Sequence, residues 1–520
     1  MLAGYSNSLR WVLRHRFLML LVTGVTICLT IWLYAIVPKG FFPQQDTGLI
    51  IGITEAAQDI SFDAMSAKQK QVAKIVESDP AVATVTSVLG SGGGASINTG
   101  RMFIVLKPRS ERNATATEVV ARIRSKTARL VGIGVYLQAA QDISIGGRAT
   151  KGQYIYSLVS LSQEDLDEYV PKLMAALQKS PKLKDLTTDE EQNGLQSNVV
   201  VDRAKAAQLG IQPQQVDSAL YSAFGQRQVS VVYNERDQFH VVLEAAPEYL
   251  ADPTALNKIY ISGTNGLEVP LSTIARVESK NTPTAINHQG QLPAVTFSFN
   301  LDPGTSLSQA TEIIDKAAQS VHLPDTIRGS FQGTAQVFEE SLSSEPLLIL
   351  TAIIAVYIVL GVLYESYIHP ITILSTLPSA GLGALLALLI CRVELSIVSI
   401  IGIILLIGIV KKNAIMMVDF ALEAEREQNL SAADAIYQAC VVRFRPIIMT
   451  TMAALFGAIP LAMGMGEGSE VRQPLGVAII GGLIVSQLLT LFTTPIIYLY
   501  MDRLRTRRRE PVPMAEPHLV

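Results

Sequence analysis

The sequence predicts a membrane α-helical bundle of six transmembrane helices, joined to a large water-facing domain of the α+β class. The mean hydropathy is +0.32 and 49% of the 520 residues are hydrophobic, which is high for a soluble protein. Six apolar stretches are long enough to cross a bilayer, which takes about 20 residues as a helix. One lies near the N-terminus and five lie near the C-terminus, so a separate mixed-polarity part lies between them.

The first apolar stretch is expected to span the membrane and to stay attached, because no small-residue cleavage site follows it. Arginines gather before this stretch, in the loop before the fifth and after the last. Six spans place all three groups on one side, and the positive-inside rule makes that side the cytoplasm. We therefore expect an inner-membrane protein with both termini cytoplasmic and a large periplasmic domain. The expected spans are Phe17–Val37, Leu347–Leu363, Ile371–Cys391, Ile397–Phe420, Pro446–Met463 and Leu475–Tyr500.

The polar part reads as two copies of a ferredoxin-like split β-α-β unit, about 100 residues apart. β-branched residues are dense in the expected strands, and apolar residues recur at helical spacing between them. The first copy has strands at Leu49–Ile53, Ala83–Leu89, Met102–Leu106 and Val135–Gln138, and helices at Ser61–Ser78 and Glu118–Leu130. The second begins near Tyr154, with helices at Leu166–Lys179 and Ser306–Val321 and a last strand at Ile327–Phe331.

A block of different character, Asn198 to Ser279, is expected to be an inserted subdomain. Within it we expect a β-hairpin that turns at Asn234–Asp237. The glycine-rich stretch Ser91–Ala95 does not follow a strand with the spacing of a phosphate-binding loop, so we interpret it as a flexible loop.

Small residues and charges also mark expected packing in the bundle. Gly381, Gly383 and Ala384, and the pair Gly481–Gly482, should permit close helix contact. The stretch Ala421–Ala439 is expected to form an amphipathic helix along the cytoplasmic membrane surface.

Lys411 and Lys412 lie deep in the fourth expected span. A lysine at the bilayer centre costs roughly 2.5–3.5 kcal/mol on insertion scales. The two lysines are about four helical turns from Ile397 and two from Phe420, too far from either end to reach the interface easily. A charge at this depth requires a partner carboxylate, and no apolar span of the sequence offers one at matching depth.

Several stretches resemble the resistance–nodulation–division (RND) efflux transporters of the hydrophobe/amphiphile branch, and within it the heteromeric multidrug pumps. Such transporters have twelve spans in two repeats, each with one span, a periplasmic insert and five further spans. This chain carries one such unit, and its motifs resemble the C-terminal half. The resembling stretches are VPKGFFPQQDTG (37–48), DRAKAAQLGI (202–211), FGQRQVSVVY (224–233), the long run from Tyr357 to Leu388, LIGIVKKNAIMMVDFALEAE (406–425) and RFRPIIMTTMAALFGAIPL (443–461).

The resemblance implies a division into segments. They are a cytoplasmic N-terminus with the first span (1–37), a first porter subdomain (38–140), a second porter subdomain (141–197 and 280–346), a docking or funnel subdomain (198–279), a five-helix transmembrane bundle (347–500) and a basic cytoplasmic tail (501–520).

The resemblance also implies a proton relay. Lys412 matches a lysine that pairs with two aspartates on the family's N-terminal half, and Thr450 matches a relay threonine. Arg443 matches an arginine near the cytoplasmic proton exit. Asp419 is either part of the proton path or an interfacial carboxylate, and Asn413 is either a relay group or a packing contact between helices.

Substrate residues are implied less fully. Phe103 matches a pocket position, and Ser91, Gly92, Gly93 and Gly94 belong to the mobile loop beside it. The loop has no phenylalanine, although aromatic drugs require broad apolar contact. This subunit therefore either binds substrate poorly or binds another class of compound.

Together these observations predict a proton-driven efflux component that exports drugs or other small amphiphilic compounds, and not an enzyme. The implied partners are an N-terminal half with intramembrane aspartates, related subunits of a homo- or heterotrimer, a periplasmic adaptor and an outer-membrane channel. Two alternatives remain: a structural partner subunit or truncated half that neither binds drug nor moves protons, and a secretion-type relative that aids protein export. The six histidines lack ligand spacing and the net charge is −3, so we expect no metal, cofactor or nucleic acid.

Overall fold

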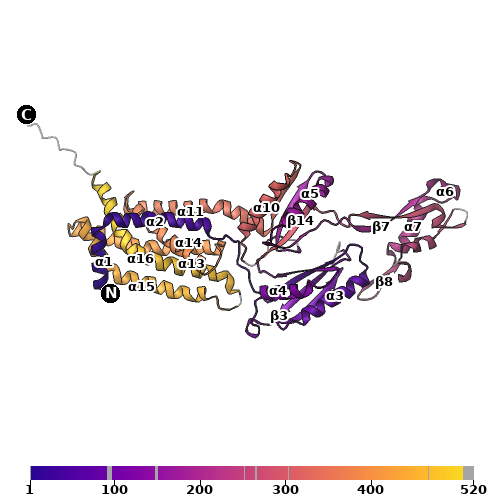
Figure 1. The fold of residues 1–520 in the computed structure, drawn as a ribbon, viewed down its shortest axis with the longest axis horizontal. Coiled ribbons are helices and arrows are strands. Elements are labelled where there is room, and N and C mark those ends of the chain that lie inside the picture. The colour runs from indigo at the N-terminus through magenta and orange to yellow at the C-terminus, as the bar shows by residue number, and fades with distance from the viewer. Residues whose placement is uncertain are drawn as a thin grey trace, which may run out of the picture.

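The computed structural model describes residues 2–507, apart from 91–95, 144, 147–149, 251, 264–265, 303 and 467. The molecule is elongated, with a helical bundle at one end, a sheet-containing part in the middle and a smaller part at the far end (Figure 1). The short helix α1 and the last helix α16 meet at the outer end of the bundle (Figure 1).

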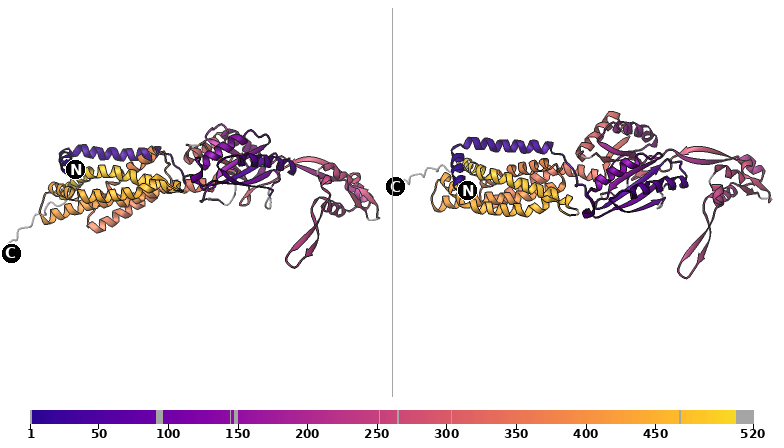
Figure 2. Two further views of the ribbon diagram at one scale, coloured as in Figure 1. Left: turned by 90° about the horizontal axis from the view of Figure 1, so that it is seen from below. Right: turned by 60° about the horizontal axis from the view of Figure 1, so that its bottom comes forward.

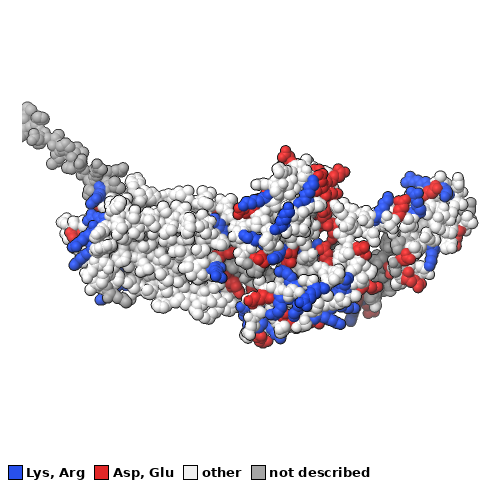
Figure 3. Space-filling model, viewed as in Figure 1, with Lys and Arg blue, Asp and Glu red and all other residues white. Residues whose placement is uncertain are grey.

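Six helices of the described residues are long and apolar enough to cross a membrane, as the sequence predicts. On the face seen in Figure 3, charged side chains gather at the two ends of the bundle and over the sheets, and the flank between is uncharged. This distribution fits a bilayer around the bundle. The bundle also includes the short helix α1 (Leu2–Arg14), and one of the six spans is divided into α12 (His369–Leu374) and α13 (Leu377–Ile390). The other five spans are α2 (Arg16–Ile36), α11 (Thr334–Tyr364), α14 (Ile397–Glu427), α15 (Ala432–Met463) and α16 (Ser469–Arg507).

One expectation about the bundle is wrong. The stretch Ala421–Ala439 is not a separate surface helix, because α14 continues to Glu427 and α15 begins at Ala432 and runs on into the fifth span. The fifth predicted span, Pro446–Met463, is present, but its helix is longer than predicted, and Pro446 lies inside it. The expected third span is divided into α12 and α13, and Pro378 lies in the first turn of α13, a position where its missing N–H leaves no helical bond unmade.

The predicted close contact between small residues is confirmed where α13 crosses α16. A Cβ atom at Gly383 would lie 2.4 Å from the carbonyl oxygen of Gly481, and one at Gly481 would lie 2.2 Å from the Cβ of Ala387. The two backbones therefore touch, which only glycine permits at these positions.

The first sheet has the strand order β2-β3-β1-β4 and is antiparallel throughout. Helices α3 and α4 cover one face, where Met65, Val72 and Ile123 are fully buried with Ile50 and Ile104 of the strands. The elements are β1 (Leu49–Ala56), α3 (Phe62–Glu77), β2 (Val82–Leu89), β3 (Thr99–Leu106), α4 (Ala116–Thr127) and β4 (Ile133–Ala139).

The second sheet repeats this topology, with β5, β6, β14 and β15 in the roles of β1 to β4. Helices α5 and α10 pack on Phe297, Phe299 and Leu158, which are fully buried. The elements are β5 (Tyr154–Ser160), α5 (Gln163–Leu177), β6 (Leu183–Thr188), β13 (His288–Gln289), β14 (Leu292–Leu301), α10 (Leu307–Val321) and β15 (Ile327–Gln332).

The far part lies between β6 and β14 in the sequence and is joined to the rest by a two-stranded ribbon of β7 and β12. The predicted hairpin is present as β8 and β9, and it projects from this part (Figure 2). The elements are β7 (Gly194–Val201), α6 (Arg203–Gln208), α7 (Pro213–Phe224), β8 (Arg227–Tyr233), β9 (Gln238–Leu243), α8 (Pro247–Leu250), β10 (Tyr260–Ser262), β11 (Glu268–Pro270), α9 (Leu271–Ile274) and β12 (Ala275–Thr282).

Candidate functional site

Lys412 lies on an uncovered face of α14. Its side chain is exposed, and the exposed residues Ile401, Leu405 and Gly408 precede it along the helix. Their spacings of four, three and four residues place all of them on one side of the helix. Lys412 is therefore an ammonium group in the middle of an apolar stripe that nothing in the described chain covers.

Asn413, unlike Lys412, is buried, at the place where three helices meet. Its Nδ2 donates a hydrogen bond to Oγ1 of Thr451 on α15 at 3.1 Å, and that hydroxyl donates to Oε1 of Gln487 on α16 at 2.7 Å. These bonds join the middle of the bundle across α14, α15 and α16. Asn413 thus forms a packing contact, and a role in proton transfer stays a prediction.

Thr450 is next to Thr451 but faces outward. Its side chain is exposed, and its hydroxyl donates a hydrogen bond to the Ile447 carbonyl oxygen within α15. Because the buried neighbours Asn413 and Thr451 meet directly, the exposed Lys412 and Thr450 belong to adjoining parts of the bundle surface. The exposed residues Met449 and Phe456 continue this surface along α15.

Two predicted residues lie nearer the end of the bundle that carries α1. Asp419 is exposed, seven residues after Lys412, and accepts a hydrogen bond from the hydroxyl of Tyr364 on α11. The guanidinium of Arg443 lies over the ring of Phe420, with its central carbon 5.1 Å from the ring centroid. The structure does not bring Arg443 into an ion pair with any carboxylate of the described residues.

Phe103 lies on the open face of the first sheet, opposite α3 and α4. The strand register places it beside Thr86 on β2 and Ile51 on β1. Its side chain is 40% exposed. The next row of this face holds Arg101 beside Ile53, so an exposed cation accompanies the apolar surface. Ser91, Gly92, Gly93 and Gly94, predicted to border this site, lie outside the described residues.

Charged residues connect the two sheets. Arg124 on α4 forms an ion pair with Asp185 on β6, which also accepts a hydrogen bond from Asn300 on β14 at 2.8 Å. Lys151 contacts Glu55 of β1 at 2.7 Å. These contacts hold one sheet unit against the other.

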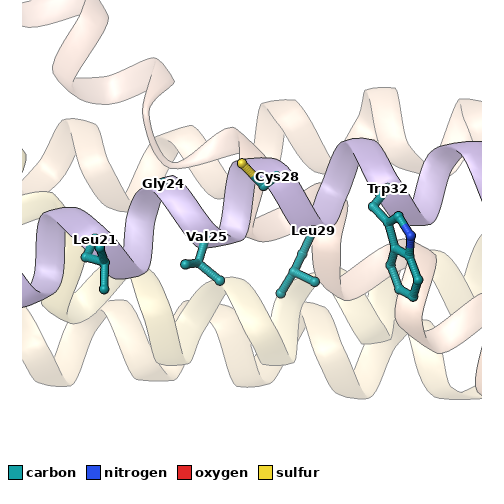
Figure 4. Close-up of a pocket in the computed structure, with 6 residues that line it drawn as sticks. All are labelled: Leu21, Gly24, Val25, Cys28, Leu29 and Trp32. Atoms are coloured by element: carbon teal, nitrogen blue, oxygen red, sulfur yellow. The ribbon is translucent and has the colours of Figure 1, made fainter.

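An open apolar groove lies along α2 (Figure 4). All of its lining side chains belong to this one helix, which is consistent with contact to lipid acyl chains. The residues are Leu21, Gly24, Val25, Cys28, Leu29 and Trp32. We assign no substrate role to the groove.

Sequence reasoning overlooked Gln487 and His369. Gln487 is the single amide side chain in the stretch from Leu483 to Leu488. A polar side chain inside a membrane span is the feature that could have indicated its role. His369 has no metal-ligand spacing in the sequence, so no motif indicates it. In the described residues no group of three or more His, Cys, Asp or Glu side chains is placed to hold a metal ion.

The apolar six-helix unit, the intramembrane lysine and the two split β-α-β sheets form the arrangement that the resemblance to the RND family predicts. The profile of the AcrB/AcrD/AcrF family matches residues 1–502, and the chain belongs to this family. The chain resembles the C-terminal half of such a transporter.

Curated relatives support this assignment. The multidrug resistance protein MdtC of Escherichia coli (strain UTI89 / UPEC) is 53% identical over 504 residues, which cover 97% of this chain and 49% of the relative. The MdtC protein of Salmonella typhi is 52% identical over 515 residues, covering 99% and 50%. The chain therefore spans about half the length of these relatives.

A solved structure shows the same fold. The crystal structure of a heavy metal efflux pump superposes with a TM-score of 0.86 at 22% identity, covering 96% of this chain and 52% of the pump.

Proposed function

We propose that the chain is a component of a proton-driven RND efflux transporter in the inner membrane, which exports drugs or other amphiphilic compounds from the periplasm. The observation that carries this proposal is the exposed Lys412 on the uncovered apolar stripe of α14. A cation at this depth is costly unless a carboxylate faces it. The stripe therefore receives a second six-helix unit, and that unit supplies the carboxylate.

The proposed chemistry is a charge exchange at Lys412. When the facing carboxylate is ionised, it pairs with the ammonium group. When the carboxylate takes up a proton from the periplasm, it loses its charge and releases the lysine, which then approaches another acceptor such as Thr450. The adjoining surfaces of α14 and α15 suit this exchange, because both side chains face outward. The resulting helix shift would drive the substrate-binding part.

Lys412→Ala tests this function, with Lys411→Ala as the matched control. We expect Lys412→Ala to reduce efflux at least tenfold in cells or vesicles that contain the chain together with the aspartate-bearing half. Lys411→Ala should retain most of the activity, because adjacent positions differ by about 100° around the helix. Full efflux by Lys412→Ala, at wild-type protein levels, would contradict a proton-coupling role for this subunit.

Substrate contact is assigned to the open face of the first sheet around Phe103. The exposed apolar side chains on this face of the sheet suit contact with the apolar part of an amphiphile. The proposed assembly is a trimer of related subunits with a periplasmic adaptor and an outer-membrane channel. The basic residues at the outer end of the bundle would face the cytoplasm.

A second function, a structural subunit that transmits motion without binding substrate, is favoured by one observation. Phe103 is the only aromatic residue among the described positions of β2 and β3. Phe103→Ala distinguishes the two, since a binding subunit should lose affinity for an amphiphilic dye and a purely structural one should not.

A further inference from the structure

A histidine lies buried at the end of the bundle that carries α1 and the end of α16. His369 begins α12 and is 6% exposed. Helix α12 packs against α11, α14 and α16, so the imidazole is enclosed by three other helices. A buried ionisable side chain inside a membrane bundle is costly and points to a functional role.

Two tyrosines flank the imidazole ring. The ring of Tyr364, on α11, has its centroid 6.1 Å from that of His369, and the ring of Tyr498, on α16, has its centroid at 6.3 Å and is nearly parallel. Tyr498 is fully buried. The histidine is thus held between aromatic side chains of two helices.

Each tyrosine in turn binds a carboxylate of α14. The Tyr364 hydroxyl donates to Oδ1 of Asp419, and the Tyr498 hydroxyl donates to Oε1 of Glu425 at 2.7 Å. His369 therefore lies beside two tyrosine–carboxylate pairs. One carboxylate, Asp419, is seven residues from Lys412, and the other, Glu425, is near the end of the helix.

Other charged groups lie on the same elements. Glu365 follows Tyr364 at the end of α11 and is exposed, and Asp502 and Arg503 lie about one turn beyond Tyr498 on α16. Histidine is the side chain whose ordinary pKa lies nearest to neutral pH, so it can accept and release a proton within the physiological range.

We propose that His369 carries the proton at the exit end of the coupling path, between Asp419 and Glu425. The inference rests on the proposed proton-driven function. In the first step a proton leaves the Asp419 carboxyl and binds an imidazole nitrogen, giving a carboxylate and an imidazolium. In the second step the imidazolium passes that proton to the Glu425 carboxylate, and water then takes it from Glu425. Only O–H and N–H bonds change, and the histidine ends neutral.

The first test does not depend on transport. The chain, with ¹⁵N-labelled histidine and in lipid nanodiscs, is titrated from pH 5 to 8 by NMR, and His369→Gln assigns the signal by its loss. We expect the His369 signal to change from imidazolium to imidazole within this range. Its midpoint should move in both Asp419→Asn and Glu425→Gln. A His369 signal that does not titrate, or whose midpoint ignores both carboxylate variants, would overturn the proposal.

The second test uses vesicles that hold the chain with its aspartate-bearing half. We expect His369→Gln to lower proton-coupled transport at least tenfold and to leave dye binding unchanged. Lys412→Ala, measured in parallel, separates the two proposals. If Lys412→Ala abolishes transport and His369→Gln does not, the role of His369 is wrong and the proposed function stands. If neither variant affects transport, the proposed function fails.

Discussion

Neighbouring polar residues on α14 have opposite environments. Lys412 is exposed on an apolar surface, whereas Asn413 is buried and bonded to Thr451. The sequence predicts that the two differ in direction, because consecutive helical residues point about 100° apart. It does not indicate which of them faces the rest of this chain. The direction of Asn413 is decided by contacts with distant residues. One of them is Gln487, 74 positions away, whose Oε1 lies 3.5 Å from the Asn413 Nδ2.

Glu190 gives a pH-dependent prediction in the water-facing part. Burial, together with the nearby charges of Asp167 and Asp189, raises the pKa of its carboxyl to about 7. Gln192 bridges the cluster by donating to Glu190 at 2.9 Å and to Asp167 at 2.7 Å. The folded chain thus keeps a proton on Glu190 that the unfolded chain releases above its ordinary pKa of 4.5. The free energy of unfolding therefore falls as the pH rises from about 4.5 to about 7.

Removing this carboxylate should stabilise the folded chain only above that range. We expect Glu190→Gln to raise the thermal unfolding midpoint by about 1–3 °C at pH 8 and to leave it unchanged at pH 5, a modest effect because water screens a half-buried group. Glu235→Gln, at the exposed tip of the β8–β9 hairpin, is the control and should change neither value. An equal gain at both pH values would show that charge is not the cause.

At the scale of elements, the helix crossing of α13 and α16 depends on glycine. Gly383→Ala would place a methyl group 2.4 Å from the Gly481 carbonyl oxygen and 2.7 Å from the Cβ of Val485, so the helices must separate. We expect a loss of about 1–3 kcal/mol in the free energy of unfolding, typical of overpacking. The change is measured by unfolding the chain in detergent micelles.

Gly24→Ala is the matched control for this prediction. It also replaces a glycine inside a membrane helix, but a Cβ there meets no atom within 4 Å. Alanine is favoured over glycine in helices by roughly 0.5–1 kcal/mol, so this variant should be neutral or more stable. Equal losses in both variants would contradict the close-contact interpretation.

The elements themselves were largely predictable. The strand β1 and the helix α3 follow from alternation and from apolar spacing, and Ser61 caps α3 as its side-chain oxygen suggests. Helix α15 begins well before the fifth predicted span, because Arg443, Arg445 and Pro446 interrupt its apolar sequence. The turns before Pro446 remain helical because Ile436, Ala439 and Cys440 are buried against the rest of the bundle, which is a tertiary effect.

At the scale of the whole molecule, contacts between residues far apart in the sequence are the hardest to predict. The inserted far part separates β6 from β14 by about 100 residues, and both strands nevertheless pair in one sheet. The repeat of the split β-α-β pattern predicts that pairing. It does not predict how one sheet unit contacts the other, because charged surface positions carry no periodicity. Arg124 and Asp185 are such positions.

The Arg124–Asp185 ion pair should stabilise the joint between the two sheet units. The Arg124 side chain is 33% exposed and that of Asp185 is 13% exposed, so removing the cation leaves a largely buried carboxylate with Asn300 as its remaining partner. We expect Arg124→Gln to lower the free energy of unfolding by about 1–3 kcal/mol, less than for a fully buried pair. Adding Asp185→Asn to Arg124→Gln removes the unpaired carboxylate, so the double variant should recover part of that loss in a double-mutant cycle.

A second measurement is amide hydrogen exchange, which should become faster in α4 and β6 and stay unchanged in β3, at the centre of the first sheet. Arg129→Gln, just beyond α4 and exposed, should alter neither measurement. Additive losses in the double variant would mean that other contacts, such as Lys151 with Glu55, hold the two units together.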